Sequence, residues 1–244
     1  FMTKIKVGIL GPSGRMGKSL LEQIKNFKEL QLSSLCEKKS HPMIGKKIDG
    51  VTVQKDLKNF VDQSQVIIDF SIPDATLCLM NQIKKSNKKT ALVTGTTGYT
   101  NNQEKKFLKF SNGLKILRSF NMSIGITILK NLVTITSKNF SDNCDVEISE
   151  IHHKMKRDIP SGTAISLANS INQGLDEPKK FNYRKQSSSL IKKKNEIGFT
   201  SIRGGDTVGE HTVFFFMDGE RIELSHRASD RKIFSNGALN AAKW

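Results

Sequence analysis

The sequence has little cysteine, and none of it is arranged for a disulfide framework or a metal site. Cys36, Cys78 and Cys144 are widely separated and odd in number, and their spacing matches no metal-ligand motif. We therefore expect unpaired thiols in a reducing compartment, a cytoplasmic location and no bound metal.

Long apolar runs are also absent. No stretch approaches the length of a membrane span, and no signal-peptide pattern is visible. Hydrophobic residues make up 36% of the chain and charged residues 25%, which is typical of a globular protein in water. The 244 residues are enough for one large or two modest domains with a full core. The sequence contains no internal repeats.

Acidic residues are scarce relative to basic ones: 23 Asp and Glu face 39 Lys and Arg, for a net charge of +16. The lysines occur as scattered pairs without interleaved aromatic residues or a nucleic-acid-binding motif. Those clusters are residues 46–47, 84–85, 88–89, 105–106, 179–180 and 192–194. We interpret them as solvated faces of helices and loops and expect no nucleic-acid partner. Such a field would still speed the arrival of an anionic substrate and cofactor.

A glycine-rich turn joins an apolar run to a helix-like run at the start of the chain. Residues 5–10 are typical of a buried strand, residues 18–24 of a helix, and the turn between them is Gly11-Pro-Ser-Gly14-Arg-Met-Gly17. Gly11 permits a tight turn, Gly14 lets the backbone approach a pyrophosphate, and Gly17 allows the helix to pack closely on the strand. The pattern predicts a dinucleotide-binding βαβ unit, although a glycine turn without a nucleotide also fits it.

The residue after the next apolar run supports the nucleotide interpretation. Residues 30–36 form that run and end in Glu37, where an acidic side chain can bind ribose hydroxyls. Lys38 and Lys39 follow directly and could instead contact a 2′-phosphate. Cofactor preference therefore stays open, and we expect both NADH and NADPH to be used.

Strand and helix patterns go on alternating to about residue 120. The expected strands are residues 65–70, 90–94 and 114–119, and the expected helices are residues 73–87 and 101–111. Ligands bind beyond the carboxyl ends of the strands in an open parallel sheet, so the loops there should share one rim. Those loops are residues 11–17, 71–74, 95–98 and 119–123. Gly95, Thr96 and Thr97 would then face the nicotinamide, whereas alone they would indicate only a turn.

The pattern changes after Asn121. We expect a helix at residues 124–140, strands at residues 146–151, 196–203, 207–217 and 221–227, and a hairpin turn at Asp218-Gly219. Residues 177–195 are polar and lysine-rich and are expected to form a mobile loop. The predicted fold class is α/β: an N-terminal Rossmann-type parallel sheet, followed by an α+β domain whose open mixed sheet has helices on one face.

Residues 150–164 carry the densest set of reactive side chains, in the order Glu-Ile-His-His-Lys-Met-Lys-Arg-Asp-Ile-Pro-Ser-Gly-Thr-Ala. Ser161 is well placed to cap a helix at residues 164–173, whose first N–H groups, on Gly162 and Thr163, could bind a carboxylate or phosphate. Lys156 and the histidines would supply charge and transferable protons beside that anion. The segment indicates an active site for an anionic small molecule, although adjacent histidines are often only surface or packing residues.

Two adjacent histidines place a condition on the local backbone. Successive residues of a strand point to opposite faces of the sheet. His152 and His153 can therefore share a pocket only if the strand ends or breaks at this point.

These motifs resemble those of the dihydrodipicolinate reductase family, nearly from end to end. The most specific is the string His-His-x-x-Lys-x-Asp-x-Pro-Ser-Gly-Thr, which spans residues 152–163. The other matching segments are residues 11–17, 95–98, 121–125, 203–211 and 225–231.

The resemblance implies a tetrameric cytoplasmic enzyme that uses NADH or NADPH to reduce a cyclic conjugated imine dicarboxylate, a step in diaminopimelate and lysine biosynthesis. It implies a dinucleotide-binding domain at residues 1–121, with residues 230–244 returning to it. Residues 122–229 would form the domain for substrate binding and tetramerisation.

The resemblance also implies roles for individual residues. His152 is the expected proton donor or acceptor, and Lys156 is the expected proton donor. The expected substrate-binding residues are His153, Ser161, Gly162 and Thr163. The expected cofactor-binding residues are Gly11, Pro12, Ser13, Gly14, Arg15, Met16, Gly17, Glu37, Lys38, Gly95, Thr96, Thr97, Ser119, Phe120, Asn121 and Met122.

Two other functions stay open. One is a related NAD(P)-dependent amino-acid dehydrogenase, such as an aspartate dehydrogenase. A histidine–lysine pair beside Pro-Ser-Gly-Thr argues against it. The other is a non-enzymatic nucleotide or nucleic-acid binder that uses the basic surface.

Overall fold

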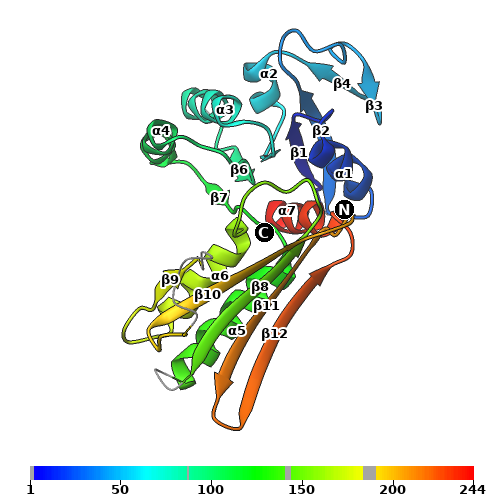
Figure 1. Ribbon diagram of the computed structural model, residues 1–244. Coiled ribbons are helices and arrows are strands. Elements are labelled where there is room, and N and C mark those ends of the chain that lie inside the picture. Colours follow the sequence, from blue (N-terminus) through cyan, green and yellow to red (C-terminus); the bar gives the residue numbers. More distant parts are fainter. Residues whose placement is uncertain (1–2, 87, 141–143, 184–190) are drawn as a thin grey trace. The chain divides into compact units, whose positions relative to one another are not determined.

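The computed structural model describes residues 3–86, 88–140, 144–183 and 191–244. The chain divides into two compact units (Figure 1). The first, the N-terminal unit, contains residues 1–122 and 232–244, and the second contains residues 123–231. The chain therefore crosses from one unit to the other and returns.

A seven-stranded sheet forms the centre of the N-terminal unit, in the order β3-β4-β2-β1-β5-β6-β7. Its strands are β1 (Ile5–Leu10), β2 (Leu30–Cys36), β3 (Lys47–Ile48), β4 (Val51–Gln54), β5 (Val66–Asp69), β6 (Ala91–Thr94) and β7 (Ile116–Arg118). All neighbours are parallel except β3 and β4. The order reverses at β1 and β5, so the loops after these two strands border the crevice where such sheets bind ligands.

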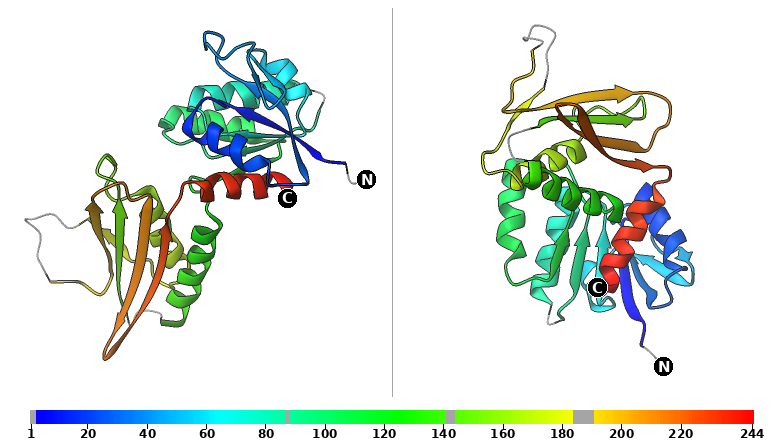
Figure 2. Two further views of the ribbon diagram at one scale, coloured as in Figure 1. Left: turned by 90° about the vertical axis from the view of Figure 1, so that its right-hand side faces the viewer. Right: turned by 90° about the horizontal axis from the view of Figure 1, so that it is seen from below.

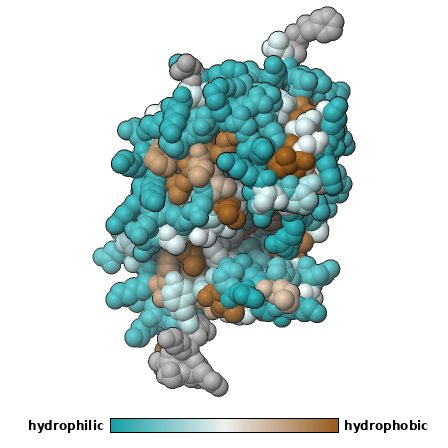
Figure 3. Space-filling model, turned by 90° about the horizontal axis from the view of Figure 1, so that it is seen from above, coloured by the Kyte–Doolittle hydropathy of each residue, from teal (hydrophilic) through white to brown (hydrophobic). Residues whose placement is uncertain are grey.

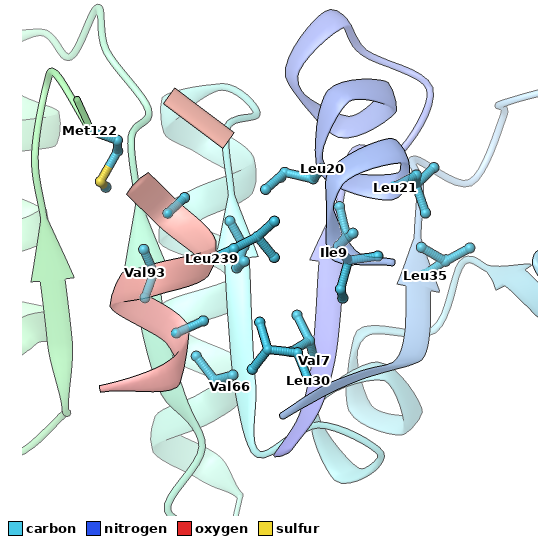
Figure 4. Close-up of a cluster of buried hydrophobic side chains, with 14 of the residues drawn as sticks. Val7, Ile9, Leu20, Leu21, Leu30, Leu35, Val66, Val93, Met122 and Leu239 are labelled. Atoms are coloured by element: carbon cyan, nitrogen blue, oxygen red, sulfur yellow. The ribbon is translucent and has the colours of Figure 1, made fainter. Parts of the chain in front are cut away.

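The described residues of this unit form five helices: α1 (Arg15–Ile24), α2 (Leu57–Asp62), α3 (Pro73–Lys85), α4 (Asn101–Ser111) and α7 (Lys232–Lys243). α7 packs against α1, β5 and β6. Figure 4 shows Leu239 of α7 in the same buried cluster as Leu20 of α1 and Val7, Ile9 and Val93 of the sheet. The last helix of the chain thus completes the core that the first strand begins.

A five-stranded mixed sheet forms the second unit, in the order β12-β11-β8-β10-β9. Its elements are α5 (Ile124–Phe140), β8 (Asp145–His152), α6 (Gly162–Gln173), β9 (Lys180–Asn182), β10 (Glu196–Arg203), β11 (Gly209–Met217) and β12 (Glu220–Ala228). Alternate residues of β8 and β11 are buried against α5 and α6, among them Ile148, Val213 and Phe215. Figures 1 and 2 show both helices on this one face of the sheet. The predicted fold class is confirmed.

The predicted loop at residues 177–195 is partly wrong, because β9 lies within it and pairs with β10. Two of its lysines are not solvated either. Lys179 is 4% exposed and donates its Nζ to the carbonyl of Lys194 at 2.6 Å. Lys192 Nζ lies 2.7 Å from Glu147 Oε1. Residues 184–190 of this predicted loop lie outside the described residues.

The other predicted elements shift by a few residues at most. The expected helix at residues 73–87 ends at Lys85, and Asn87 lies outside the described residues. Three short elements, β3, β4 and α2, were not predicted, because runs of two to six residues carry too little periodicity.

The remaining lysine pairs lie at the surface as expected. Both residues of each pair at 46–47, 84–85, 88–89 and 105–106 are exposed. Figure 3 shows hydrophilic residues over most of one face of the molecule, with separate hydrophobic patches. None of the helices in the described part of the chain has the length and apolar character needed to cross a membrane.

Gly237 of α7 gives a test of how closely this helix packs. A Cβ at this position would lie 1.7 Å from the carbonyl oxygen of Met122, which is backbone and cannot rotate away. Helix propensity alone predicts that Gly237→Ala stabilises the protein by about 1 kcal/mol. We expect the opposite sign, a net loss of roughly 1–3 kcal/mol in the free energy of unfolding, because of this clash.

Urea unfolding of Gly237→Ala measures the effect. Gly204→Ala is the matched control, because nothing lies within 4 Å of a Cβ at that position. Equal or higher stability of Gly237→Ala would show that α7 is not held this tightly.

Candidate active site

The glycine-rich turn follows β1 and leads into α1. Gly11 has a φ of +73° and donates its N–H to the carbonyl of Cys36 at 2.9 Å. A Cβ on Gly17 would lie 2.2 Å from the carbonyl oxygen of Gly11. Gly17 therefore lets α1 pack closely against the backbone that directly follows β1. Gly14 directly precedes the first residue of α1 and is exposed to solvent.

Glu37 reaches back to this turn. Its Oε1 accepts a hydrogen bond from the Ser13 N–H at 3.1 Å and another from the Ser13 hydroxyl. Lys38 and Lys39 are exposed beside it. The structure thus brings Glu37 and the turn together, at the end of β2 where a ribose would lie in this fold.

A buried carboxylate, Asp69, ties the next two loops together. Asp69 is 0% exposed and accepts hydrogen bonds from the Ser71 N–H at 2.9 Å and from four hydroxyl groups. The hydroxyl donors are Ser71 at 2.5 Å, Thr76 at 2.6 Å, Thr94 at 2.9 Å and Thr96 at 3.1 Å. Asp69 therefore fixes the loops after β5 and β6 at the rim of the sheet.

The hydrogen bonds of Asp69 bear on the predicted cofactor residues Gly95, Thr96 and Thr97. The Thr96 side chain is 2% exposed and points to Asp69, whereas Thr97 is exposed. A Cβ on Gly95 would lie 2.1 Å from the ring of Phe70, so glycine is needed for that packing. Part of this motif therefore serves the structure of the loop.

The segment after β7 contains the last predicted cofactor residues. Ser119 donates its N–H to Thr94 at 3.1 Å and its hydroxyl to the carbonyl of Asn121 at 2.7 Å. Phe120 is 66% exposed, while the Met122 side chain is 7% exposed and belongs to the hydrophobic core. Arg118 lies 4.8 Å from the centre of the Phe120 ring.

In the second unit, β8 ends at His152, so the strand does not continue through both histidines. His152 is 8% exposed and lies on the side of the sheet that faces the helices. His153 follows the strand, is half-buried and donates its N–H to the carbonyl of Thr207 at 2.8 Å. The condition for both rings to share a pocket is therefore met.

Glu150 is the most buried charged residue beside these histidines, with 0% exposure. Its Oε2 lies 2.5 Å from His152 Nδ1 and accepts from Arg203 at 2.8 Å. Its Oε1 accepts from Arg203 at 2.7 Å and from the Ser161 N–H at 3.2 Å. Burial alone would raise the pKa of Glu150, but the hydrogen bonds from His152 and Arg203 lower it well below its ordinary value. Glu150 is therefore charged at neutral pH.

Ser161 joins this cluster to α6. Its hydroxyl accepts from the Ala164 N–H at 3.2 Å, which confirms the predicted cap of the helix. The same hydroxyl lies 2.9 Å from Nε2 of His211, which is 4% exposed. Burial and the neighbouring His152 lower the pKa of His211 to about 3. His211 is thus neutral and can accept the hydroxyl proton of Ser161.

Lys156 forms an ion pair with Asp158, with its Nζ 2.8 Å from each carboxylate oxygen. Partial burial would raise the pKa of Asp158, but hydrogen bonds from Lys156 and from backbone groups, including that of Gly162, lower it. The predicted anion-binding site at the start of α6 therefore lies next to the Asp158 carboxylate of the chain itself. Gly162 is exposed and Thr163 half-buried at this helix end.

Sequence reasoning missed four residues that organise the site: Asp69, Glu150, Arg203 and His211. A signal existed for Glu150, because it lies two residues before His152 on a strand and thus on the same face. Arg203 and His211 begin and end one of the matching segments, but only the pairing of β8 with β10 and β11 places them beside Glu150. Among the described residues, no group of three or more His, Cys, Asp or Glu side chains is arranged to hold a metal ion.

Two family models match the chain. The dihydrodipicolinate reductase N-terminus model matches residues 5–122, and the C-terminus model matches residues 125–244. This chain belongs to the dihydrodipicolinate reductase family. The family predicted from the motifs is confirmed.

Similar proteins of known name extend over the whole chain. The 4-hydroxy-tetrahydrodipicolinate reductase of Pelagibacter ubique is 39% identical over 248 residues, covering 100% of this chain and 93% of the relative. That of a Nitratiruptor species is also 39% identical, covering 98% and 93%.

Solved structures share the fold at lower identity. A dipicolinate-bound dihydrodipicolinate reductase from a Paenisporosarcina species has a TM-score of 0.79 at 22% identity and covers 99% of this chain and 94% of that one. An aspartate dehydrogenase from Thermotoga maritima has a TM-score of 0.52 at 13% identity, covering 98% and 95%. At these identities the likeness shows the fold alone.

The depressed pKa of His211 predicts how the stability depends on pH. The pKa of about 3 lies below the ordinary value of 6.5, so between these values the unfolded chain binds the proton and the folded chain does not. The free energy of unfolding should therefore fall as the pH is lowered from 6.5 toward 3, by up to about 1.4 kcal/mol per pH unit from this residue.

Urea unfolding of the wild type and His211→Asn between pH 7 and pH 4.5 measures this slope. We expect a shallower loss of stability in His211→Asn, whatever its stability at pH 7. Equal slopes for the two proteins would rule out a buried neutral His211.

Proposed function

We propose that this chain reduces 4-hydroxy-tetrahydrodipicolinate to tetrahydrodipicolinate with NADH or NADPH, in diaminopimelate and lysine biosynthesis. The observation that carries the proposal is the 39% identity, over nearly its whole length, to reductases of that name. The chain is accordingly an NAD(P)H-dependent oxidoreductase, in agreement with the function and cofactor predicted from the motifs.

The reaction needs a proton as well as a hydride. When the dinucleotide is bound, it supplies the hydride. Negative charge then builds on the substrate ring, and a proton donor beside it lowers the barrier. His152 donates or accepts the proton, and Lys156 is a second donor whose ammonium group also neutralises substrate charge. Lys156 is only 20% exposed at its side chain, so its charge acts in a partly desolvated place.

The start of α6 binds the substrate carboxylates. Gly162 and Thr163 present backbone N–H groups at the positive end of this helix. Ser161 holds the turn through its cap and through its N–H bond to Glu150, and His153 directly follows the end of β8. These four residues make the substrate-binding set.

The rim of the N-terminal sheet binds the cofactor. Gly11 to Gly17 and the N-terminus of α1 accommodate the pyrophosphate, because glycines leave room and helix N–H groups attract anions. Glu37 accepts from the ribose hydroxyls, and Lys38 meets a 2′-phosphate. Gly95 to Thr97 and Ser119 to Met122 lie at the nicotinamide end. The fixed geometry of the first turn supports this, since Glu37 already hydrogen-bonds Ser13 within it.

The two parts of the chain divide these tasks. Residues 1–121, with residues 230–244, hold the cofactor, and residues 122–229 bind the substrate and form a homotetramer. The sheet face of the second unit opposite α5 and α6 supports an assembly role. It carries the stacked rings of Phe214 and Phe216, 5.7 Å apart, and Ile202, which is 46% exposed. The absence of disulfides among the described cysteines is in keeping with a cytoplasmic enzyme.

An amino-acid dehydrogenase of the aspartate dehydrogenase type is the alternative enzyme. Its support is a shared fold at 13% identity, which does not extend to the reaction. Oxidation of NADH in the presence of the dipicolinate precursor, compared with oxaloacetate plus ammonia, separates the two. Tight DNA binding at physiological salt without either activity would instead favour a nucleic-acid binder.

Removing the proposed proton donors should slow turnover. We expect His152→Ala and Lys156→Ala each to lower kcat by about 100-fold or more, since positioned acids contribute factors of that order. Steady-state kinetics with NADH measure the effect, and Lys154→Ala is the control because Lys154 is exposed two residues earlier. Near-normal kcat in both variants would exclude these roles.

Lys38 should influence only one of the two cofactors. We expect Lys38→Ala to raise the KM for NADPH by about tenfold, because a cation at a phosphate contributes on the order of 1 kcal/mol or more, and to leave the KM for NADH unchanged. Lys39→Ala is the matched control. A similar change in both KM values would place Lys38 away from the 2′-phosphate.

A further inference from the structure

Glu150 stands apart from the residues assigned so far, because it touches both the proposed proton donor and the proposed substrate-binding turn. Both of its oxygens are occupied: Oε1 by Arg203 and the Ser161 N–H, and Oε2 by Arg203 and His152 Nδ1. Its side chain is completely buried. A buried charge of this kind is costly unless every partner is in place.

The chemistry of the partners fixes the position of one proton. An ionised carboxylate only accepts hydrogen bonds, so His152 Nδ1 must be the donor in its contact with Glu150. Arg203 has five N–H donors and cannot give up its proton, so two hydrogen bonds from it keep Glu150 ionised. The proton on Nδ1 is therefore held in place, whether the ring of His152 is charged or neutral.

The other ring nitrogen lies in a more open place. A Cβ at Gly209 would come within 3.0 Å of His152 Nε2, so the absence of a side chain there leaves space beside this nitrogen. About a tenth of the His152 side-chain surface is exposed. Nε2 is thus the nitrogen that can exchange a proton with a bound molecule.

We propose that Glu150 is a positioning residue that keeps the His152 proton on Nδ1 and leaves Nε2 as the nitrogen that exchanges the catalytic proton. Arg203 supports this role by keeping the carboxylate charged and oriented. The inference rests on the proposed function, because it assigns a partner to the proposed proton donor. Unlike the proposed function, the role of Glu150 can be tested without measuring enzymatic turnover.

The direct test is the protonation of the His152 ring in the wild-type protein, read from the ¹⁵N chemical shifts of its two nitrogens between pH 5 and pH 9. His152→Asn identifies the signals. We expect Nδ1 to be protonated at every pH in this range, with any change confined to Nε2. An unprotonated Nδ1 at any pH in the range would overturn the inference.

Glu150→Gln tests the consequence for turnover. The amide can donate to Nδ1, so we expect the neutral ring to move its proton to Nε2 and kcat to fall by roughly 10- to 100-fold, part of the contribution of a positioned acid. Glu147→Gln is the matched control on the same strand, where Glu147 pairs with Lys192. It should keep the wild-type ring protonation and kcat.

A double variant separates this role from a general structural one. If Glu150 acts through His152, then Glu150→Gln causes no further loss of kcat in the His152→Ala background. An equal loss in both backgrounds would contradict the inference. Absence of reductase activity in the wild type would instead contradict the proposed function, while the ring protonation of His152 would still decide the role of Glu150.

Discussion

The geometry of the site in the second unit depends on the hydrogen bonds of one fully buried carboxylate, Glu150. It lies where three separate parts of the chain meet: the end of β8, the end of β10 through Arg203, and the turn before α6 through Ser161. Because a buried charge is tolerated only with complete hydrogen bonding, these three parts must adopt one mutual arrangement. The same hydrogen bonds that offset the cost of burying Glu150 also fix the position of the His152 ring.

The N-terminal unit uses the same device at another strand end. Asp69 is the last residue of β5 and accepts hydrogen bonds from hydroxyl groups of the two loops after β5 and β6, of α3 and of the end of β6. Loops at the carboxyl ends of parallel strands would otherwise be mobile, since few of their backbone groups pair with the sheet. In each unit a single acidic residue at 0% exposure thus stiffens the loops that the proposed ligands would touch.

The sequence was most informative where periodicity or a motif was long. The helix at residues 124–140 and the strand at residues 196–203 were predicted with the boundaries that the structure has. The cap by Ser161 also followed from local chemistry. The strand end between the two histidines meets the condition that the sequence set for a shared pocket. In contrast, β9 was hidden in a lysine-rich stretch, because the pairing of three residues with β10 depends on tertiary contact. Asp69 and Arg203 could not be predicted for a related reason: their partners are distant in sequence, and only the sheet order brings them together.

The place of α7 has a consequence for how the protein is made. Leu239 lies in the same core as Val7, so the N-terminal unit has no complete interior until the final helix has left the ribosome. The second unit is continuous in sequence and is synthesised before that helix. Domains tend to fold as units during synthesis. The second unit can therefore become native before the N-terminal unit, although most of the N-terminal unit is synthesised earlier.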